Sequence, residues 1–407
     1  MKQKQQAITI LILGSLSTIS PFSIDMYLPG FPAIAKDLST SIANVQLSLT
    51  SYFIGIAGGQ LLYGPLLDKF GRKLPLYTGL AVYIIASLAC ALTASVESLI
   101  TMRLFQALGG CAGMVAAQTL VRDLFPVQRT ANVFSWMTLV VAVSPMIAPT
   151  VGGFITTSFG WHAVFITLAL VALVILLLSY FVLEDGRKGD KTMSLKPKPV
   201  INNFISVIKE KQFLIYCVTG GLATSAPFAY IAGSSDVFIN FYHTTEQEYG
   251  WIFAIIGGVM IGCTQLNHIL LRRFKSEQVV NGALIFQTIV GIVLITGTFF
   301  NWWDKIGLIA MIALFVSPNG VINANTTALS LAPFVKNAGS AASLVGALRM
   351  TMGGITTALV SAFHNGTPTP MVIIMFMTVI GGLIVLKTGK IIIKYRAKDR
   401  TEESVII

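Results

Sequence analysis

Residues 64–73 read GPLLDKFGRK, a charged turn between two glycines with long apolar runs on both sides. Cations that anchor a turn at a membrane surface are ordinary. Asp68 is unusual in such a turn, because a carboxylate at the membrane edge is costly without a partner. Asp68 can accept a hydrogen bond from Arg72 and face a helix N-terminus in the other half of the chain, where negative charge is favoured. We therefore expect a charged latch that gates one face of the protein, built from Gly64, Asp68, Gly71, Arg72 and Asp123.

The composition is that of an integral membrane protein. Apolar residues make up 54% of the 407 residues, charged residues only 11%, and the mean hydropathy is +0.76. A soluble domain has about 25% charged residues, so a water-soluble enzyme, a disordered protein and a nucleic-acid-binding protein are excluded. In hydrocarbon each apolar segment must be a helix. We predict an all-α membrane protein with twelve spans, at roughly 8–34, 44–67, 74–94, 98–121, 131–155, 162–183, 212–240, 249–271, 278–299, 304–330, 338–363 and 369–393.

The positions of the basic residues predict the orientation. With the N-terminus in the cytoplasm, 24 of the 28 Lys and Arg residues fall in cytoplasmic segments. Lys36 and Lys305 fall in the opposite loops, and Arg103 and Arg349 fall inside spans. The positive-inside rule therefore places both termini in the cytoplasm. The net charge of +11 reflects this topology and contact with anionic lipid rather than binding of nucleic acid.

A hydrophilic stretch divides the chain into two halves of six spans. We predict a first bundle at 1–183, a cytoplasmic linker at 184–211 with an amphipathic helix at 200–211, and a second bundle with the tail at 212–407. Two halves of six spans are typical of duplicated transporters. The four cysteines each lie in an apolar run, so we expect buried thiols and neither disulfides nor a metal site.

Three motifs resemble those of the major facilitator superfamily. GPLLDKFGRK resembles its G-x-L-a-D-r-x-G-r-k signature. RLFQALGG at 103–110 resembles its R-x-x-Q-G motif, with Ala107 in place of the glycine. SPMIAPTVGG at 144–153 resembles its G-P-x-x-G-G antiporter motif, with Ala148 at the first glycine position. This motif marks exporters in the superfamily, and ordinary tight helix packing is the alternative. Its residues in this chain are Pro145, Pro149, Gly152 and Gly153.

The first two spans narrow the resemblance. FSIDMYLPGFPAIAKDL at 22–38 and the stretch 46–73 resemble the bicyclomycin-resistance (Bcr/CflA) branch of the drug:proton antiporters, as AGSAASLVGALR at 338–349 does more loosely. The resemblance implies export of drugs or small metabolites across the bacterial inner membrane. It also implies energy from the proton gradient without a cofactor, and a small molecule, protons and membrane lipid as partners. A monomer suffices for such a mechanism.

Three ionisable groups are candidates for proton coupling, because charges at membrane depth are functional by default. Asp25 and Arg103 lie roughly 26 Å and 27 Å from the cytoplasmic ends of their spans. In the superfamily these helices line one cavity. We expect an ion pair whose rearrangement binds or releases a proton; a static pair that braces the two helices is the alternative. Asp236, near the outer end of span seven, is either a second proton or cation site or a solvated residue at the mouth.

Further residues are candidates for a substrate cavity. Arg349, in the middle of span eleven, either attracts an anionic group of the substrate or pairs with a backbone carbonyl. Aromatic walls with a few polar groups suit amphipathic ligands, although helix packing is the alternative at each position. The remaining candidates are Tyr27, Phe31, Tyr52, Phe53, Gln118, Tyr230, Phe238 and Asn325.

Rival functions lack the motifs they need. A membrane enzyme would need a catalytic cluster, but the four histidines are scattered and neither H-E-x-x-H nor G-x-S-x-G occurs. An ATP-driven pump would need G-x-x-x-x-G-K-[ST], which is also missing from the sequence. A channel or a receptor would not explain Asp68. Proton-coupled import of a nutrient or siderophore stays open as the alternative to export.

Overall fold

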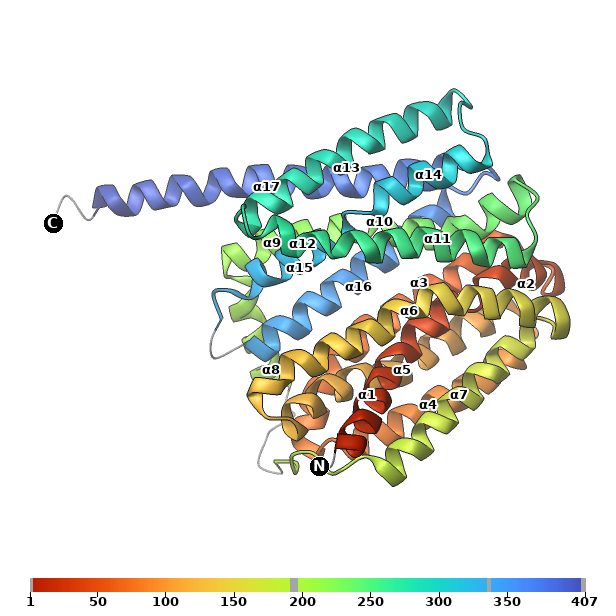
Figure 1. Ribbon diagram of the computed structural model, residues 1–407, viewed down its shortest axis with the longest axis horizontal. Coiled ribbons are helices and arrows are strands. Elements are labelled where there is room, and N and C mark those ends of the chain that lie inside the picture. The colour runs from red at the N-terminus through yellow and green to blue at the C-terminus, as the bar shows by residue number, and fades with distance from the viewer. Residues whose placement is uncertain (1–2, 191–196, 335–337, 404–407) are drawn as a thin grey trace.

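A computed structural model describes residues 3–190, 197–334 and 338–403, and within these ranges the chain forms helices and turns and no strand (Figure 1). The first half consists of α1 (Gln3–Asp25), η1 (Leu28–Gly30), α2 (Phe31–Asp37), α3 (Ile42–Phe70), α4 (Lys73–Ala91), α5 (Val96–Leu124), α6 (Val127–Phe159) and α7 (Trp161–Val182). After α8 (Pro197–Ile208), the second half consists of α9 (Lys211–Ala223), α10 (Ala226–Ser235), η2 (Asp236–Phe241), α11 (Glu246–Thr264), α12 (Leu266–Leu270), α13 (Ser276–Phe299), α14 (Lys305–Val316), α15 (Asn319–Leu331), α16 (Ala338–Ala362) and α17 (Thr369–Glu403). Each predicted span is one helix or one interrupted helix, which confirms the all-α fold.

The two sets of helices lie side by side. In Figure 1, α1–α7 fill the lower part of the molecule and α9–α17 the upper part. We call the end that carries α8 and the turn at Arg72 the basic end, and the end that carries α2 and the turn at Gly160 the opposite end. Some predicted features lie outside the described residues, namely the stretches 1–2, 191–196 and 404–407 and the loop cation Lys336.

Eleven of the spans pass a test of length and apolar composition, and α3 does not. It carries polar residues such as Gln46 and Ser48, which are fully buried against other helices. Two glycines allow its close approach to α5. A methyl group at Gly55 would lie 2.6 Å from Cβ of Ala107, and one at Gly59 would lie 2.7 Å from Cβ of Cys111. The interior position of α3 explains how a polar helix crosses the membrane, since its neighbours shield it from lipid.

Four spans are interrupted: a break at Gln265 separates α11 from α12 in span eight, and the other three breaks lie beside prolines. Span one stops at Asp25 before η1 and α2, span seven breaks between Ala223 and Ala226, and span ten breaks between Val316 and Asn319. Prolines follow or occupy each of these three breaks, and a proline lacks the N–H that a continuous helix needs. Interruptions of spans one and seven stand at corresponding places in the two halves, which in transporters point to the binding site.

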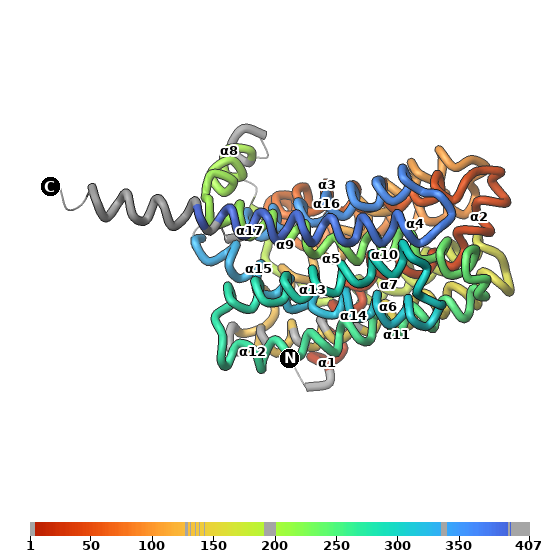
Figure 2. The backbone as a smooth tube through the Cα atoms, turned by 90° about the horizontal axis from the view of Figure 1, so that it is seen from above, coloured from red at the N-terminus to blue at the C-terminus, as the bar shows by residue number. Residues whose placement is uncertain are grey.

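Two pairs of helices join the halves, and Figure 2 shows them on opposite sides of the molecule. In the α3–α16 pair, Oγ1 of Thr50 lies 2.8 Å from Oγ1 of Thr357, and Oγ of Ser361 donates to the carbonyl oxygen of Ala43 at 2.6 Å. The second pair is α6–α11, whose glycines are described below. Both pairs are in contact at the opposite end, so the halves are closed against each other there.

Candidate functional site

Arg103 of α5 is fully buried in a box of aromatic and neutral polar groups. Its Nη1 donates to Oε1 of Gln106 at 2.5 Å, and its Nη2 donates to the carbonyl oxygen of Ser23 at 2.9 Å. The guanidinium carbon lies 4.2 Å from the ring centre of Tyr27 and 4.1 Å from that of Tyr52. Desolvated cation–π contacts of this kind contribute about 2 kcal/mol each. The aromatic rings and the neutral oxygens thus hold the buried cation.

The predicted ion pair between Asp25 and Arg103 is wrong. Within the described chain, neither residue has an oppositely charged group within 4.0 Å. The predicted depth was close, because Arg103 contacts Ser23, which lies two residues before Asp25. Arg103 thus reaches the backbone of α1 two residues before Asp25 and not the Asp25 carboxylate. Asp25 lies near Tyr230 and Tyr249 of the second half.

A hydrogen-bond network holds the Arg103 box rigid. Nε2 of Gln106 donates to Oγ of Ser87 at 2.7 Å, and Oγ of Ser23 lies 2.5 Å from the hydroxyl oxygen of Tyr83. These residues belong to α1, α4 and α5, so the network connects three spans of the first half. Arg103 therefore has the surroundings of a structural brace, whereas Asp25 faces the other half.

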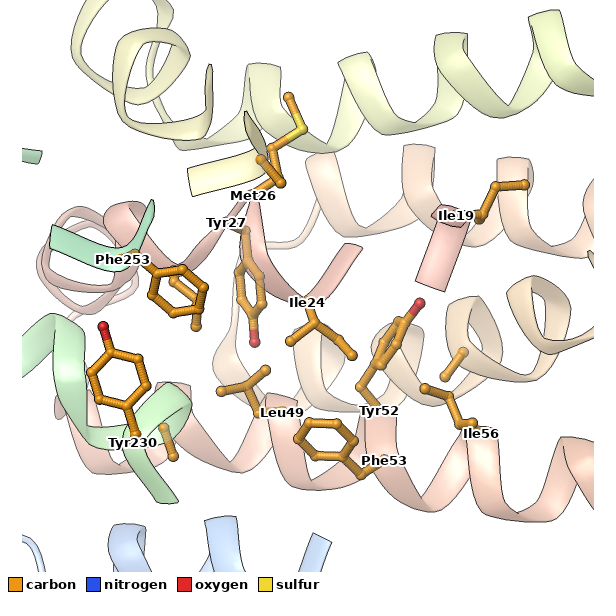
Figure 3. Packing of buried hydrophobic residues seen from close by; sticks show 14 of the residues in the cluster. Ile19, Ile24, Met26, Tyr27, Leu49, Tyr52, Phe53, Ile56, Tyr230 and Phe253 are labelled. Atoms are coloured by element: carbon orange, nitrogen blue, oxygen red, sulfur yellow. The ribbon is translucent and has the colours of Figure 1, made fainter. Parts of the chain in front are cut away.

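The aromatic residues predicted for a substrate cavity pack in the core between and within the halves. Figure 3 shows Tyr27 of the first half near Phe253 and Tyr230 of the second half, with Tyr52 and Phe53 further along the same core. The rings of Tyr230 and Phe253 stack with centres 5.4 Å apart, and those of Phe53 and Phe228 lie 4.6 Å apart across the two halves. All six predicted aromatic residues are buried, namely Tyr27, Phe31, Tyr52, Phe53, Tyr230 and Phe238.

The polar cavity candidates lie on three helices. Gln118 is exposed on α5. Asn325 of α15 is buried, and its Nδ2 donates to Oδ1 of Asn267 at 2.6 Å. Arg349 of α16 is half-buried and hydrogen-bonded to α15. The structure therefore separates Arg349 and Asn325 from the Arg103 box.

Asp236 has a partner that the sequence analysis missed. The carboxylate is buried, which excludes the interpretation as a solvated residue at the mouth. Its Oδ2 lies 2.7 Å from Nε2 of His364, and its Oδ1 accepts a hydrogen bond from Nδ2 of Asn240 at 2.7 Å. Asp236 begins the short π-helix η2, and His364 follows the end of α16. No sequence pattern connects two residues 128 positions apart, so the packing of span seven on span eleven was needed to find this pair.

We expect Asp236 and His364 to be energetically coupled. Asp236→Asn and His364→Gln will each lower the melting temperature of the purified protein, because each leaves a partly buried polar group without its partner. The double variant will melt close to the less stable of the two single variants. The contact between the two side chains is worth about 1–3 kcal/mol, and either single substitution already removes it. Thermal unfolding of all four proteins in one detergent measures this coupling. Additive shifts would show that the pair contributes nothing.

The charged latch at the basic end is formed around Arg72. Its Nη1 donates to Oδ1 of Asp68 at 2.8 Å, and its Nε donates to Oδ2 of Asp123 at 2.7 Å. The start of the linker closes over this group. The backbone N–H of Arg187 donates to Oδ2 of Asp123 at 3.0 Å, and that of Asp190 donates to the carbonyl oxygen of Asp68 at 2.9 Å. The latch therefore connects α3, α5 and the linker.

Two further contacts hold the linker on the turn. Gly71 has a φ of +83°, and a methyl group there would lie 3.3 Å from the amide nitrogen of Gly189. Nζ of Lys73 lies 2.6 Å from Oδ1 of Asp185, and this hydrogen-bonded ammonium holds the pKa of Asp185 below its usual value. Glycine suits position 71 because other residues rarely adopt a positive φ.

Among the described residues, Asp68 makes no ion pair or side-chain hydrogen bond with the other half. The side chain of Asp68 is half exposed and bonds to Arg72 of its own half. Gly64, one turn earlier, lies near the first turns of α16, because a methyl group on it would be 3.7 Å from Oγ of Ser343.

Removing Arg72 will release the linker. In Arg72→Gln protein, Asp68 and Asp123 lose their shared cation, and we expect trypsin to cut the stretch 185–190 about tenfold faster than in wild type, the ratio that corresponds to about 1.4 kcal/mol. Limited proteolysis of purified protein in nanodiscs measures the rate. Lys73→Gln is the matched control, because it removes a single ion pair with the exposed carboxylate of Asp185, and exposed pairs contribute little. Equal rates in both variants would contradict the assignment.

The antiporter motif lies where α6 meets two other spans. A methyl group at Gly152 would lie 1.8 Å from the carbonyl oxygen of Met26, directly after Asp25. One at Gly153 would lie 2.5 Å from the carbonyl oxygen of Glu246 at the start of α11. Pro149 and Pro145 face Gly250 and Gly257 of α11 in the same way. The motif is therefore a close contact of span five with the break in span one and with the second half.

An additional cavity lies inside the first half. It measures about 490 Å³ and is lined by α1, α4, α6 and α7. Its walls are mostly apolar, with the hydroxyls of Ser15, Thr18 and Ser144 among them. None of the predicted site residues lines this cavity, so it is separate from the contact between the halves.

Twelve spans in two sets of six, interrupted helices at corresponding places and charges held between the spans define a membrane transporter. The chain belongs to the Major Facilitator Superfamily, whose sequence profile matches residues 13–361. It is therefore a multi-pass transporter and not an enzyme.

Relatives place the chain within this family. It is 35% identical to a bicyclomycin resistance protein homolog of Haemophilus influenzae, over 92% of this chain and 94% of that protein. It is 32% identical to the uncharacterized MFS-type transporter YdgK of Bacillus subtilis, over 93% and 95% of the two chains. The multidrug resistance protein MdtL of Escherichia coli is 29% identical over 69% of this chain and 71% of its own length. These matches confirm the resemblance to the bicyclomycin-resistance branch.

Solved structures share the fold at low sequence identity. A bacterial homolog of the human lysosomal transporter Spinster, in an inward-facing and unoccupied conformation, superposes with a TM-score of 0.72 at 14% identity, covering 96% of both chains. The nucleoside transporter NupG superposes with a TM-score of 0.72 at 13% identity, covering 94% of this chain and 98% of that one. At these identities the matches show the fold alone.

Proposed function

We propose that this transporter exports drugs or other small amphipathic molecules in exchange for protons, by alternating access in the bacterial cytoplasmic membrane. The drug-resistance relatives and the antiporter motif at 144–153 support export. The distribution of Lys and Arg places both termini in the cytoplasm. No cofactor takes part in this mechanism, and the proton gradient supplies the energy.

The position of Asp25 is the observation that carries the proposal. This carboxylate ends α1 at the break in span one, is buried, and has no cation within 4.0 Å in the described parts of the chain. A buried charge without a partner is costly, and taking up a proton removes that cost. A group that lies between the halves changes its surroundings when the halves move. Proton binding at Asp25 would therefore be linked to the conformation of the transporter.

Alternating access needs a gate on each side of the membrane, and the charged latch and the antiporter motif are the candidates for these two gates. The halves, 1–183 and 212–407, would rock about the central contact while 184–211 links them. Arg72 with Asp68 and Asp123 would gate the cytoplasmic side. Pro145, Pro149, Gly152 and Gly153 would close the outer side against α11.

Proton release from inside-out vesicles tests the proposal. Vesicles with an acidic interior and a fluorescent pH probe receive a panel of antibiotics, dyes and amino acids one at a time. We expect at least one amphipathic compound to collapse the gradient in vesicles that contain the protein and not in empty ones. In intact cells, expression should lower the accumulation of the same compound. Higher accumulation would indicate import, and a gradient unaffected by every compound would contradict proton exchange.

A further inference from the structure

Two arginines lie at membrane depth, and they differ in what surrounds them. Arg103 is fully buried and covered by aromatic rings. Arg349 is only half-buried, and a solute can therefore reach it. Two lone cations within spans are unusual because each costs several kcal/mol.

The charge of Arg349 is not neutralised by the protein. In the described ranges, no carboxylate lies within 4.0 Å of it. Its partners are neutral: Nη1 donates to Oδ1 of Asn323 and to Oγ1 of Thr327 at 2.8 Å, and Nη2 donates to Oγ1 of Thr326 at 2.9 Å and to the carbonyl oxygen of Asn323 at 3.4 Å. Its Nε is buried and donates to no group. The buried acid beyond the far end of α16 is Asp236, and it binds His364. His364 lies fifteen residues, or roughly 22 Å, from Arg349 along this helix.

Arg349 lies on the side of α16 that meets the other spans of the central contact. Gly346, three residues earlier, is packed against the side-chain amide of Gln60 in α3, and Gly353, four residues later, is packed against the ring of Phe228. Residues at these spacings share one face of a helix. The guanidinium packs directly against Gly220 of α9, where a methyl group would lie 2.9 Å from Nη2. The cation therefore faces the interior and not lipid.

We propose that Arg349, with Asn323 and Thr327, binds a carboxylate or similar anionic group of the transported molecule. A guanidinium presents its N–H groups as a planar fork that matches a carboxylate. Asn323 is exposed, so its amide can rotate away and offer its NH₂ to the anion, as the hydroxyl of Thr327 can offer its proton. The aromatic pair of Phe53 and Phe228 lies beside Gly353 on the same face. The substrates would then be aryl or alkyl carboxylates.

This inference deepens the proposed function and rests on it only in treating the bound molecule as cargo. The test uses full-length protein in nanodiscs and calorimetric titration with two matched pairs of probes, 2-naphthoate with 2-naphthamide and salicylate with salicylamide. At about pH 6.5 the carboxylates are ionised and the amides, including the phenol of salicylamide, are neutral. We expect wild type to bind each carboxylate about tenfold tighter than its amide. Equal affinity for both members of each pair would overturn the proposal.

Variants locate the site. Arg349→Gln should weaken carboxylate binding about tenfold while amide binding stays within about twofold. Arg349→Lys should give an intermediate value, because it keeps the charge and loses the fork. Thr101→Ala, at an exposed polar position of α5 outside the proposed site, is the control and should bind like wild type. Equal weakening of carboxylate and amide by Arg349→Gln would overturn the proposal.

Two further variants test the site if Arg349→Gln does not fold, and the binding measurement does not depend on transport. If Arg349→Gln does not give folded protein, Asn323→Ala and Thr327→Val remove parts of the same site, and each should reduce the preference for carboxylate over amide. An unchanged preference in both would overturn the proposal. No gradient is present in the titration, so a failure of proton-coupled export in vesicles leaves the binding difference unaffected.

Discussion

Inside-out vesicles with Asp25→Asn protein will keep their proton gradient when a transported compound is added, whereas wild-type vesicles will lose it. Asparagine has the size of aspartate and cannot bind or release the proton that coupling requires. We expect substrate-dependent proton flux to fall by about two orders of magnitude. Because Asp25 makes no hydrogen bond or ion pair within the described residues, the fold should change in stability by about 1 kcal/mol or less.

Three controls make this result specific. Asp185→Asn replaces an exposed carboxylate of the linker and should leave the flux unchanged. Asp25→Glu keeps a titratable group and should retain part of the flux. Binding of the compound to Asp25→Asn protein should persist, which separates lost coupling from lost recognition. A normal response in Asp25→Asn vesicles would remove Asp25 as the proton carrier and make Asp236 the next candidate.

The spans could be predicted from the sequence because the membrane leaves few choices. A segment such as 162–183 must be a helix in hydrocarbon, and α7 is that helix. Even α3, which is too polar for a test of apolar composition, was found from the apolar residues between its glycines. The ends of the breaks were not predictable, because a proline indicates an interruption but the packing of neighbouring spans decides where the helix resumes.

The depth of the site residues in the membrane could be predicted from the sequence, but the side of the helix on which they lie could not. Counting residues placed Asp25 and Arg103 at one level, and Arg103 indeed contacts Ser23. The rotation of α1 about its axis depends on tertiary packing, which brings Asp25 near Tyr230 of the second half. The Asp236–His364 contact needs the fold itself. The Arg349 site carried a local signal, since Asn323, Thr326 and Thr327 lie at spacings of three and four residues on one helix face.

Gly152→Ala should reduce transport by about tenfold or more, although the substitution adds a single methyl group. The methyl group would lie 1.8 Å from the carbonyl oxygen and 2.7 Å from the carbonyl carbon of Met26. These are backbone atoms at the break in span one, so no side-chain rotation relieves the clash. Either α6 moves away or the break moves, and the break holds Asp25. Overpacking of this kind costs about 1–3 kcal/mol or more, and displacement of Asp25 should reduce proton-coupled flux by about tenfold or more.

Gly262→Ala in α11 is the matched control, because a methyl group there has no atom within 4 Å. In an open helix position, alanine is favoured over glycine by about 1 kcal/mol. The two substitutions are chemically identical, so the shifts in melting temperature should have opposite signs: upward for Gly262→Ala and downward for Gly152→Ala. The same protein preparations measured in vesicles should show wild-type flux for Gly262→Ala alone. If Gly152→Ala also raised the melting temperature and kept its flux, the approach of span five to the break would not hold Asp25 in place, and the antiporter motif would have no role in coupling through this contact.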